Sequence, residues 1–406
     1  MEFKKDSFIF ESYSILKDKK EIQFNYRYND LEFTERIVLP KQIPDTVNFL
    51  LLDKVLESLH LMLGISYYKM FCPSTINTPY SFSKDQVNFW NTVYTKGLGE
   101  FFFINKIDFR GLINFPYSNN VNSLAIPEKR KERSLVGIGG GKDSIVAIEM
   151  LKAENKQITG LILETGSSLI QQSVAKTSGI VYLVIKRQLD EKLFNLSNKV
   201  YNGHVPFSAI FAFISLLVSI VYDYSSVITA NEKSSSFGNI NYLGSEINHQ
   251  WSKSIEFENL FKVYAKKFIT PDFNYYSILR KYSELEITEL FAKHEKYFSV
   301  FSSCNKNFKV KNVTNKRWCG QCPKCAFVFA ILAANLSRET VAEIFNKNLM
   351  EDPKLISLYK DLIGKGTMKP FECVGTFDES LEAFRIIKNR GEFNNSIIMK
   401  TIEKLI

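Results

Sequence analysis

Four cysteines lie close together in the last third of the 406-residue chain, and the last three are separated by two residues each. These cysteines are Cys304, Cys319, Cys322 and Cys325. Zinc prefers four soft ligands in a tetrahedron, and a gap of two residues lets one turn supply neighbouring ligands. We therefore predict a structural Zn²⁺ with four protein ligands and no open position for catalysis. An iron–sulfur cluster also takes four thiolates, and unmetallated thiols are a further alternative.

A second segment that could do chemistry is the glycine loop, residues 137–144, which lies between a predicted strand and a predicted helix. Glycines let backbone amides approach an anion, and the start of the following helix adds its positive end. The loop is not a Walker A loop, because Val136 stands where that motif has its first glycine and Asp143 stands where it has Ser or Thr. It is not a dinucleotide fingerprint either, since Lys142 stands where the third glycine belongs. A glycine-rich turn with a good helix cap is the plainer alternative.

The glycine loop resembles the pyrophosphate loop of the ATP pyrophosphatases, whose motif is Ser-Gly-Gly-x-Asp-Ser. That class cleaves ATP to AMP and pyrophosphate and transfers the adenylate to a substrate oxygen. In this chain Gly139 stands in place of the first Ser. The resemblance implies that the last two glycines and Ser144 hold the β- and γ-phosphates, and that Asp143 helps to organise Mg²⁺. The implied ATP-binding residues of the loop are Gly139, Gly140, Gly141, Lys142, Asp143 and Ser144.

A polar stretch over residues 231–258 combines charged and amide side chains with aromatic ones. It follows the last predicted strand, so Glu232 and Lys233 are placed to reach the charge of a ligand. A surface loop with ion pairs is the alternative. His204 lies in residues 202–206, just before a long apolar segment. A histidine in that position is also explained as a helix cap or a core residue.

Alternating strands and helices must position these groups. Such alternation predicts an α/β fold with a parallel sheet, whose ligands lie at the carboxyl ends of the strands. Glu164 and Thr165 end the second strand, where the pyrophosphate-loop class seats its adenosine, although a helix cap explains this pair as well. The predicted strands cover residues 135–138, 158–163, 181–185 and 226–230, and the predicted helices 145–153 and 206–222.

Residues 1–130 have a different pattern of apolar residues from the alternating strands and helices that follow. Residues 8–38 alternate apolar and polar positions, which predicts a small antiparallel sheet. Residues 45–70 and 84–105 have the spacing of helices. A charged loop at 127–133 then marks a boundary. We expect an N-terminal α+β domain (1–130), a pyrophosphate-loop domain of the adenine-nucleotide alpha-hydrolase-like fold (131–300), and a C-terminal region with the cysteines and a helical tail (301–406).

Composition and charge narrow the class of protein. Apolar residues make up 45% and aromatic residues 14% of the chain, which excludes a disordered protein. The net charge of +9 permits an anionic ligand without proving a nucleic-acid partner. Residues 205–222 carry no charge, but three serines dilute them and Asp223 follows, so we expect a buried helix and no membrane insertion. The first residues show no signal-peptide pattern, and clustered cysteines suit a reducing compartment, so we expect a cytoplasmic protein.

Taken together, motifs along nearly the whole chain resemble one family, the ATP-dependent UDP-N-acetylmuramoyl-L-alanyl-L-glutamate epimerases of peptidoglycan synthesis. The most specific motifs are Asn-Gly-His-Val-Pro at 202–206, Asn-His-Gln-Trp-Ser-Lys at 248–253 and Glu-Cys-Val-Gly-Thr at 372–376. Lys233 departs mildly from the pattern, because an Arg is expected there. The other motifs cover residues 33–35, 59–61, 64–69, 139–144, 231–234, 303–305 and 318–325.

The resemblance implies that the protein converts the terminal L-Glu of UDP-MurNAc-L-Ala-L-Glu to D-Glu, using ATP and releasing AMP and pyrophosphate. An acyl-adenylate removes the charge of the carboxylate and makes the neighbouring α-proton acidic enough for a general base. The sequence does not identify this base, and we expect it first in residues 249–253. The candidate catalytic residues are Lys253, His249, Glu232 and Cys373. The candidate substrate-binding residues are Asn202, His204, Asn231, Lys233, Asn248 and Gln250.

Other functions share parts of this pattern. Some pyrophosphate-loop enzymes adenylate tRNA bases, and the basic residues between 306 and 317 could meet phosphates. Only Phe308 and Trp318 lie among these basic residues, which is a thin platform for stacking bases. Nitrile synthesis on deazaguanine uses the same kind of loop and a four-cysteine zinc site. A non-catalytic nucleotide-binding module is a third class, against which Asp143 and Ser144 argue.

Overall fold

The computed structural model describes residues 6–406 except 120, 122–123, 197–199 and 309–315. Its described part is built on one mixed sheet with strand order β11-β8-β5-β6-β7-β3-β2-β1-β4. The first five strands of this order are parallel to one another, as predicted for an α/β fold. Four of them match the predicted strands, and β11 was not foreseen. The parallel strands are β5 (Ser134–Gly137), β6 (Ile158–Glu164), β7 (Tyr182–Gln188), β8 (Ser226–Thr229) and β11 (Asn274–Ser277).

The N-terminal strands are antiparallel, as their alternation predicts, but they do not form a sheet of their own. Strand β1 (Ser7–Ile15) pairs with β2 (Glu21–Tyr28), and β2 pairs with β3 (Leu31–Val38). The end of β3 pairs with β7, so these strands extend the parallel sheet. This pairing covers an edge of β7 whose amides and carbonyls would otherwise have no partner in the sheet. Strand β4 (Thr75–Asn77) pairs in parallel with β1 at the edge of the sheet. The domain boundaries at 130 and 300 stay a prediction.

Alternate residues of the parallel strands point into two different cores. Leu135 and Val227 pack with the apolar side chains of one set of helices, whereas Val136 and Ile228 pack with a second set on the other face. Strands that are buried on both faces have nearly continuous apolar sequences, as β6 and β8 have. The first set is α1 (Phe49–Tyr68), α7 (Phe207–Tyr222) and α8 (Ile255–Tyr264), and the second is α4 (Lys142–Ala153), α5 (Leu169–Ser178), α9 (Glu284–Ala292) and α10 (Pro323–Ala333).

Helix α7 is the long apolar segment that the sequence singled out. Its side chains are buried on most of its surface, which confirms the expected core helix. The helix begins one residue later than expected, because Pro206 lies at the cap and not inside the first turn. Asp223 ends it in a left-handed conformation with φ 62°. Among the described residues, no helix combines the length and apolar composition that a membrane crossing requires.

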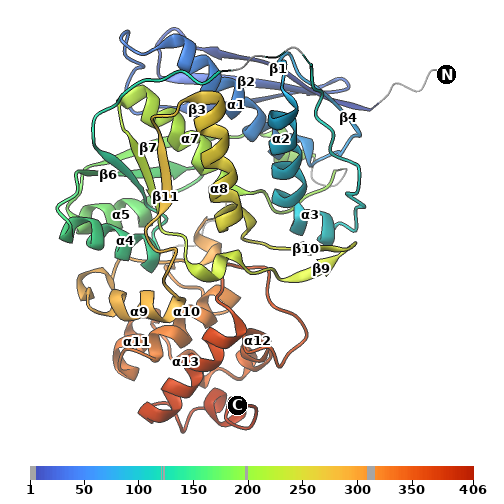
Figure 1. The fold of residues 1–406 in the computed structure, drawn as a ribbon. Helices are drawn as coiled ribbons and strands as arrows, with labels where there is room; N and C mark the ends of the chain where they lie inside the picture. The colour runs from blue at the N-terminus through green and yellow to red at the C-terminus, as the bar shows by residue number, and fades with distance from the viewer. Residues whose placement is uncertain (1–5, 120, 122–123, 197–199, 309–315) are drawn as a thin grey trace.

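The C-terminal helices gather at one end of the molecule, opposite β1 to β4 (Figure 1). They share the second core with the parallel strands. Helix α10 is buried along its whole length because it lies at the centre of this group. Around it pack α11 (Arg338–Phe345), α12 (Ile356–Leu362) and α13 (Phe377–Arg390), and α14 (Ile397–Ile402) packs against α12 and α13.

The remaining elements depart from the expectations in detail. The helix predicted over 84–105 is two helices, α2 (Lys84–Gly97) and α3 (Gly99–Ile104), which meet at Leu98. The helix predicted from residue 45 begins at Phe49, where Asn48 caps it. The polar stretch contains a hairpin that was not predicted, β9 (Ile240–Tyr242) and β10 (Ser245–Ile247). A short helix, α6 (Lys192–Asn195), follows β7.

Candidate active site

A cavity of about 790 Å³ lies at the carboxyl ends of the parallel strands, where ligands of such sheets bind. Its wall includes Gly137 at the end of β5, Leu163 in β6 and Thr229 at the end of β8. It therefore brings the glycine loop and the polar stretch to one space. The predicted site residues on its wall are Gly139, Gly141, Asp143, Ser144, Thr165, Asn202, Asn231, Lys253 and Cys373.

The glycine loop has a conformation that requires glycine. Gly140 has φ +88°, and a Cβ there would lie only 2.9 Å from Cγ2 of Ile170. A Cβ on Gly141 would lie 3.2 Å from Cβ of Ser303. Helix α4 starts directly after the loop, and Gly141 at its cap offers no side-chain acceptor to the first-turn amides. These amides are therefore available to an anion, as the sequence led us to expect.

Lys142 does not reach the cavity. Its side chain is only 2% exposed and lies beneath the loop, where Nζ contacts Glu284 and lies 2.5 Å from Oδ1 of Asp143. Burial favours protonation of Glu284 and Lys142 opposes it, and the pKa of Glu284 is raised to about 7. Burial would raise the pKa of Asp143 as well, but Lys142 and Lys324 hold it below its ordinary value. Asp143 is therefore an anion at the cavity wall.

Lys253 and Cys373 lie on the cavity wall although they are far apart in sequence. Burial alone would raise the pKa of the Cys373 thiol, but Lys253, His249 and Lys324 lower it to about 6. Burial would lower the pKa of Lys253, but Cys373 and Glu232 raise it above its ordinary value. At neutral pH the two groups are therefore a thiolate and an ammonium.

His249 and His204 lie together behind Cys373, and both contact the carboxylate of Glu100. Nδ1 of His249 hydrogen-bonds Glu100, and Nδ1 of His204 lies 3.3 Å from the same carboxylate. The two rings are 4.7 Å apart between centroids. Burial would lower the pKa of His249, but hydrogen bonds to Cys373 and Glu100 raise it to about 9. Burial, His249 and Lys69 lower the pKa of His204 well below its ordinary value, so only His249 is charged.

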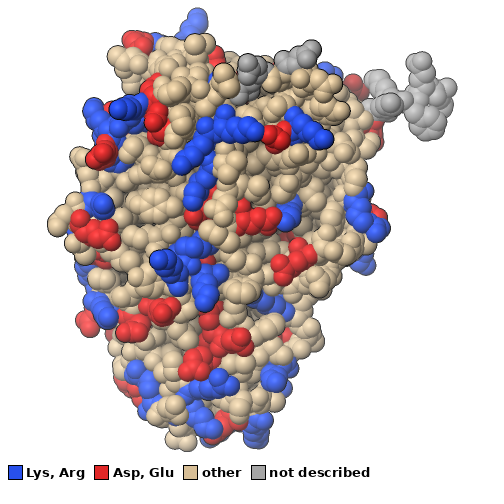
Figure 2. Space-filling view, in the orientation of Figure 1, with Lys and Arg blue, Asp and Glu red and all other residues tan. Residues whose placement is uncertain are grey.

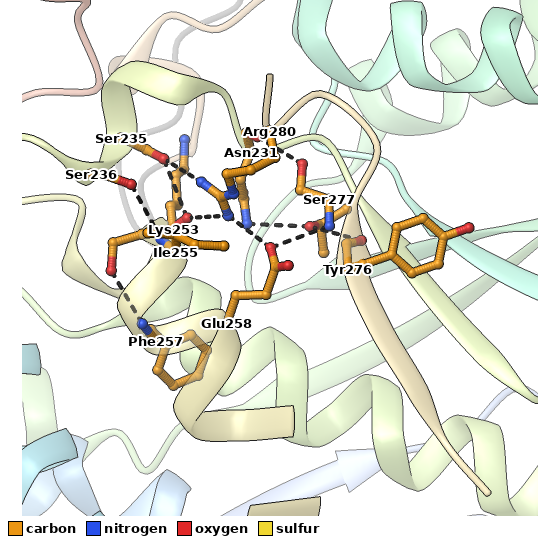
Figure 3. A network of polar contacts seen from close by, with 12 residues as sticks. Asn231, Ser235, Ser236, Lys253, Ile255, Phe257, Glu258, Tyr276, Ser277 and Arg280 are labelled. Carbon is orange, nitrogen blue, oxygen red and sulfur yellow. Dashed lines mark hydrogen bonds and ion pairs between the residues drawn. The ribbon is translucent and has the colours of Figure 1, made fainter. Parts of the chain in front are cut away.

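Arg280 holds the backbone of the polar stretch in place, and sequence reasoning missed it. Its guanidinium donates to the carbonyl of Lys253 at 2.8 Å, to the carbonyl of Glu232 at 3.2 Å, and to Oγ of Ser235 at 3.0 Å. Glu258 accepts from the same guanidinium at 2.9 Å, and Figure 3 shows the carboxylate between Arg280 and β11. Burial of this ion pair fixes the segment that carries Lys253.

Four of the predicted substrate-binding residues lie away from the cavity wall, namely His204, described above, and Asn248, Gln250 and Lys233. Asn248 accepts from the amide of Gln250 at 2.7 Å and donates to the carbonyl of Ser235 at 2.9 Å, so it shapes the turn before Trp251. Gln250 is 5% exposed, and its Oε1 has no hydrogen-bond partner in the described part of the chain. Lys233 is exposed to solvent.

The remaining predicted residues have mixed positions. Thr165 lies on the wall, and its buried hydroxyl has no partner among the described residues. Glu164 accepts from the hydroxyl of Ser168 beside the cavity. Glu232 is 2% exposed and lies below the wall, where its Oε2 is without a hydrogen-bond partner among the described residues. Asn202 lies on the wall near the start of α7.

Several cationic residues on the wall were not predicted. Lys324 lies within the cysteine motif, which gave the only local signal for it. Lys69 donates to the carbonyl of Gly203, and burial and the neighbouring Arg187 lower its pKa to about 8. Arg187 is paired with buried Glu35 of β3 at 2.6 Å. Lys69 lies in the motif at 64–69 but was not singled out, and no local pattern marks Arg187, because β3 brings its partner Glu35 from the N-terminal region.

The four clustered cysteines lie at the start of α10 and next to the glycine loop. Their Sγ atoms are all within 4.8 Å of one another, with 4.0 Å between Cys304 and Cys322 and 3.7 Å between Cys319 and Cys325. Ser302, two residues before the first cysteine, donates its amide to the carbonyl of Gly140 at 3.0 Å. The cluster could hold a metal such as zinc, and it positions the segment that meets the loop.

The fold and the cavity define an α/β protein with a ligand site at the ends of parallel strands and a cysteine cluster against that site. Comparison with known families gives the MurL N-terminal domain over residues 2–278 and the MurL C-terminal domain over residues 300–406. The chain belongs to the MurL family, which confirms the resemblance seen in the sequence.

Curated relatives carry one name, UDP-N-acetyl-alpha-D-muramoyl-L-alanyl-L-glutamate epimerase. The protein from Micromonospora sp. is 33% identical over 98% of this chain and 90% of its own length. The one from Salinispora tropica is 34% identical over 98% and 88%. The one from Xanthomonas oryzae pv. oryzae is 36% identical over 86% and 77%. In the first two of these relatives the similarity covers nearly the whole chain, so it includes the segments that line the cavity.

Proposed function

We propose that this protein epimerises the terminal L-Glu of UDP-MurNAc-L-Ala-L-Glu to D-Glu in cytoplasmic peptidoglycan precursor synthesis. We further propose that the reaction consumes ATP, passes through an acyl-adenylate and releases AMP and pyrophosphate. One observation supports both parts: a single cavity contains a loop suited to phosphates and a thiolate–ammonium pair suited to moving protons. The names of the relatives supply the substrate.

The phosphate end of the site is assigned to the glycine loop. Backbone amides at Gly140 and Gly141 and the hydroxyl of Ser144 would hold the phosphates, and the Asp143 carboxylate would hold Mg²⁺, which neutralises phosphate charge. The loop leaves space for such a group at Gly139, which lies on the cavity wall and where a Cβ would meet no atom within 4 Å. Thr165, whose hydroxyl is buried without a protein partner in the described residues, is the candidate for adenosine.

The need for activation follows from the acidity of the substrate. Removing the α-proton beside a carboxylate would place a second negative charge next to the first. An acyl-adenylate has no charge on that carbonyl, which can then accept the electron pair from Cα. Asn202 and Asn231 lie on the same wall and are candidates for binding the peptide. Lys324 and Lys69 add positive charge for a substrate with a diphosphate and carboxylates.

We also propose that the four cysteines hold a structural Zn²⁺. Zn–S bonds of about 2.3 Å in a tetrahedron place sulfurs about 3.8 Å apart, close to the separations found here. A multi-iron cluster binds its thiolates to separate irons and needs them farther apart. The ion would stabilise the segment that carries Ser303 and Lys324 on the cavity wall.

On the face shown in Figure 2, Lys and Arg side chains are interspersed with Asp and Glu. A nucleic-acid backbone is better matched by a continuous basic stripe. Of the basic residues between 306 and 317, Lys309 and Lys311 lie outside the described residues. The small anionic substrate is therefore the better match to the charges described.

The test incubates the pure protein with ATP, Mg²⁺ and UDP-MurNAc-L-Ala-L-Glu. AMP is measured directly, and the chirality of glutamate is measured after acid hydrolysis. D-Glu together with AMP is the expected result. AMP without D-Glu would contradict epimerisation, and D-Glu without AMP would contradict the ATP requirement. If neither forms, tRNA and small heterocycles become the substrates to test.

A further inference from the structure

Four segments that are distant in sequence meet behind the cavity wall. Glu100 belongs to α3, His204 precedes α7, His249 follows β10, and Cys373 lies between α12 and α13. Their side chains form a continuous series from carboxylate to imidazole to thiol, with Cys373 at the cavity. The imidazole of His204 also contacts the Glu100 carboxylate but lies outside this series.

The backbone holds this series together. The amide of His249 donates to the side chain of Asn239 at 2.9 Å, and Asn239 donates to the carbonyl of Pro370 at 3.1 Å. Lys324 donates its ammonium to the carbonyl of Cys373 and its amide to the Glu372 carboxylate, the latter at 2.8 Å. The hairpin and α10 therefore both fix the loop that carries the thiol.

We propose that Cys373 is the base that removes the α-proton of the L-glutamyl residue, and that His249 and Glu100 are positioning residues that keep it a thiolate facing the cavity. This inference rests on the proposed epimerase function and deepens it. Neither the glycine loop nor the family names assign this role to any residue. Glu100 gave no signal in the sequence.

The charges around the thiol support the assignment. Cationic Lys253 and Lys324 face it from the polar stretch and from α10, and charged His249 hydrogen-bonds it. The acidic groups behind them are Glu100 on His249 and Glu372 beside Lys324. A thiol among three cations is a thiolate at neutral pH, whereas the ammonium of Lys253 holds its proton and cannot act as the first base.

The proposed epimerisation takes two proton transfers on opposite faces of Cα. The C–H bond at Cα breaks, an S–H bond forms at Cys373, and the electron pair moves onto the carbonyl oxygen of the activated carboxyl group. The ammonium of Lys253, which lines the same cavity, then gives its proton to Cα from the other face. Exchange with solvent moves the proton from thiol to amine and restores the starting charges.

The first experiment measures the thiolate without any substrate. Alkylation of Cys373 by iodoacetamide is followed as a function of pH by mass spectrometry of the peptide that contains it. The wild-type rate should reach half its maximum near pH 6. H249Q should move this midpoint upward by about one unit or more because it removes a cation beside the thiolate, and E100Q should move it in the same direction because it removes the carboxylate that keeps His249 protonated. E154Q, at an exposed glutamate outside the site, should leave it in place. An unchanged midpoint in both E100Q and H249Q would overturn the positioning role.

The second experiment follows exchange at Cα in D₂O with the L-substrate, ATP and Mg²⁺. C373S should still form AMP but lose exchange by about 100-fold or more. K253A should exchange deuterium into the L-isomer without forming the D-isomer, since the thiol can return a proton to its own face. C72S, at a cysteine outside both sites, should behave as wild type.

The outcomes separate the two proposals. Full exchange in C373S would overturn Cys373 as the base while the epimerase function stands. Loss of both AMP formation and a cooperative melting transition in C373S would indicate misfolding, in which case K253A decides: deuterated L-isomer supports the thiol, and no deuterium in either isomer contradicts it. If the wild-type chain forms no D-Glu, the proposed function fails, and with it the assignment of the base.

Discussion

The two ends of the cavity are built in different ways. The proposed phosphate end is one short segment, the glycine loop, whose consecutive residues form part of the wall and the start of α4. The proposed proton-transfer end takes side chains from α3, the segment before α7, the polar stretch and the loop before α13. An anion site can be encoded locally, because backbone amides and a helix start suffice. An acid–base pair depends on how distant segments meet, because its charges are set by neighbours.

The largest effect is expected from K253A at the proton-transfer end. Formation of D-Glu should fall by about 10²–10⁴-fold, because the ammonium that faces the cavity is lost. ATP binding, measured by calorimetry, should stay close to that of wild type, since the glycine loop is untouched. Normal turnover in this variant would remove Lys253 from the mechanism.

G140A tests the phosphate end. The Cβ would lie 2.9 Å from Ile170, and φ +88° is unfavourable for alanine, so the loop must shift. AMP formation should fall by about 100-fold, as small misplacements in active sites do. G111A is the matched control, because Gly111 also has positive φ (+70°) but its Cβ would meet no atom within 4 Å. Equal activity of the two variants would show that the loop conformation is unimportant.

Removal of the zinc ion proposed at the four cysteines should lower activity at both ends of the cavity less strongly, by lowering the stability of the protein. Incubation with EDTA should lower the Tm by roughly 5–10 °C, because metal binding contributes to folding of the segment around the four cysteines. The loss should coincide with release of one zinc ion per chain, measured by elemental analysis. C72S should respond to EDTA as wild type does. A chelator that removes zinc without moving the Tm would contradict a structural role.

The smallest effect is expected from K233A. The side chain is exposed and the cavity wall lies elsewhere, so kcat/KM for the muramyl dipeptide should change by less than about twofold. K324A, on the wall, is the comparison and should raise KM more. A large loss in K233A would place the substrate beyond the cavity and would revive the role suggested by the sequence.

The parts that the sequence predicts best are those with a local cause. Apolar strands followed by helices predicted the parallel sheet, and residue spacing alone brought the four cysteines together. The pairing of β3 with β7 had no local sign, because it depends on two edges that are about 150 residues apart. Strand β11 escaped notice because Asn274–Ser277 is short and bears two tyrosines next to polar residues.

At the site, the same rule separates what was found from what was missed. The glycine loop could be predicted because its residue types recur at fixed spacing in a known motif. Glu100 lies in a short, mostly apolar segment without a motif, and its partners His204 and His249 come from distant parts of the chain. Arg280 and Arg187 have no motif around them either. Their importance comes from buried carbonyls and carboxylates contributed by other elements.

The contact between Ser302 and Gly140 has a consequence for how the protein is made. The ribosome releases the glycine loop well before Ser303, Lys324 and Cys373, and N-terminal parts of a chain begin to fold first. Until the cysteine cluster and the segment before α13 have been synthesised, the cavity lacks the part of its wall that they form. Catalysis in the proposed site therefore cannot begin before the segment up to Cys373 has been synthesised and folded.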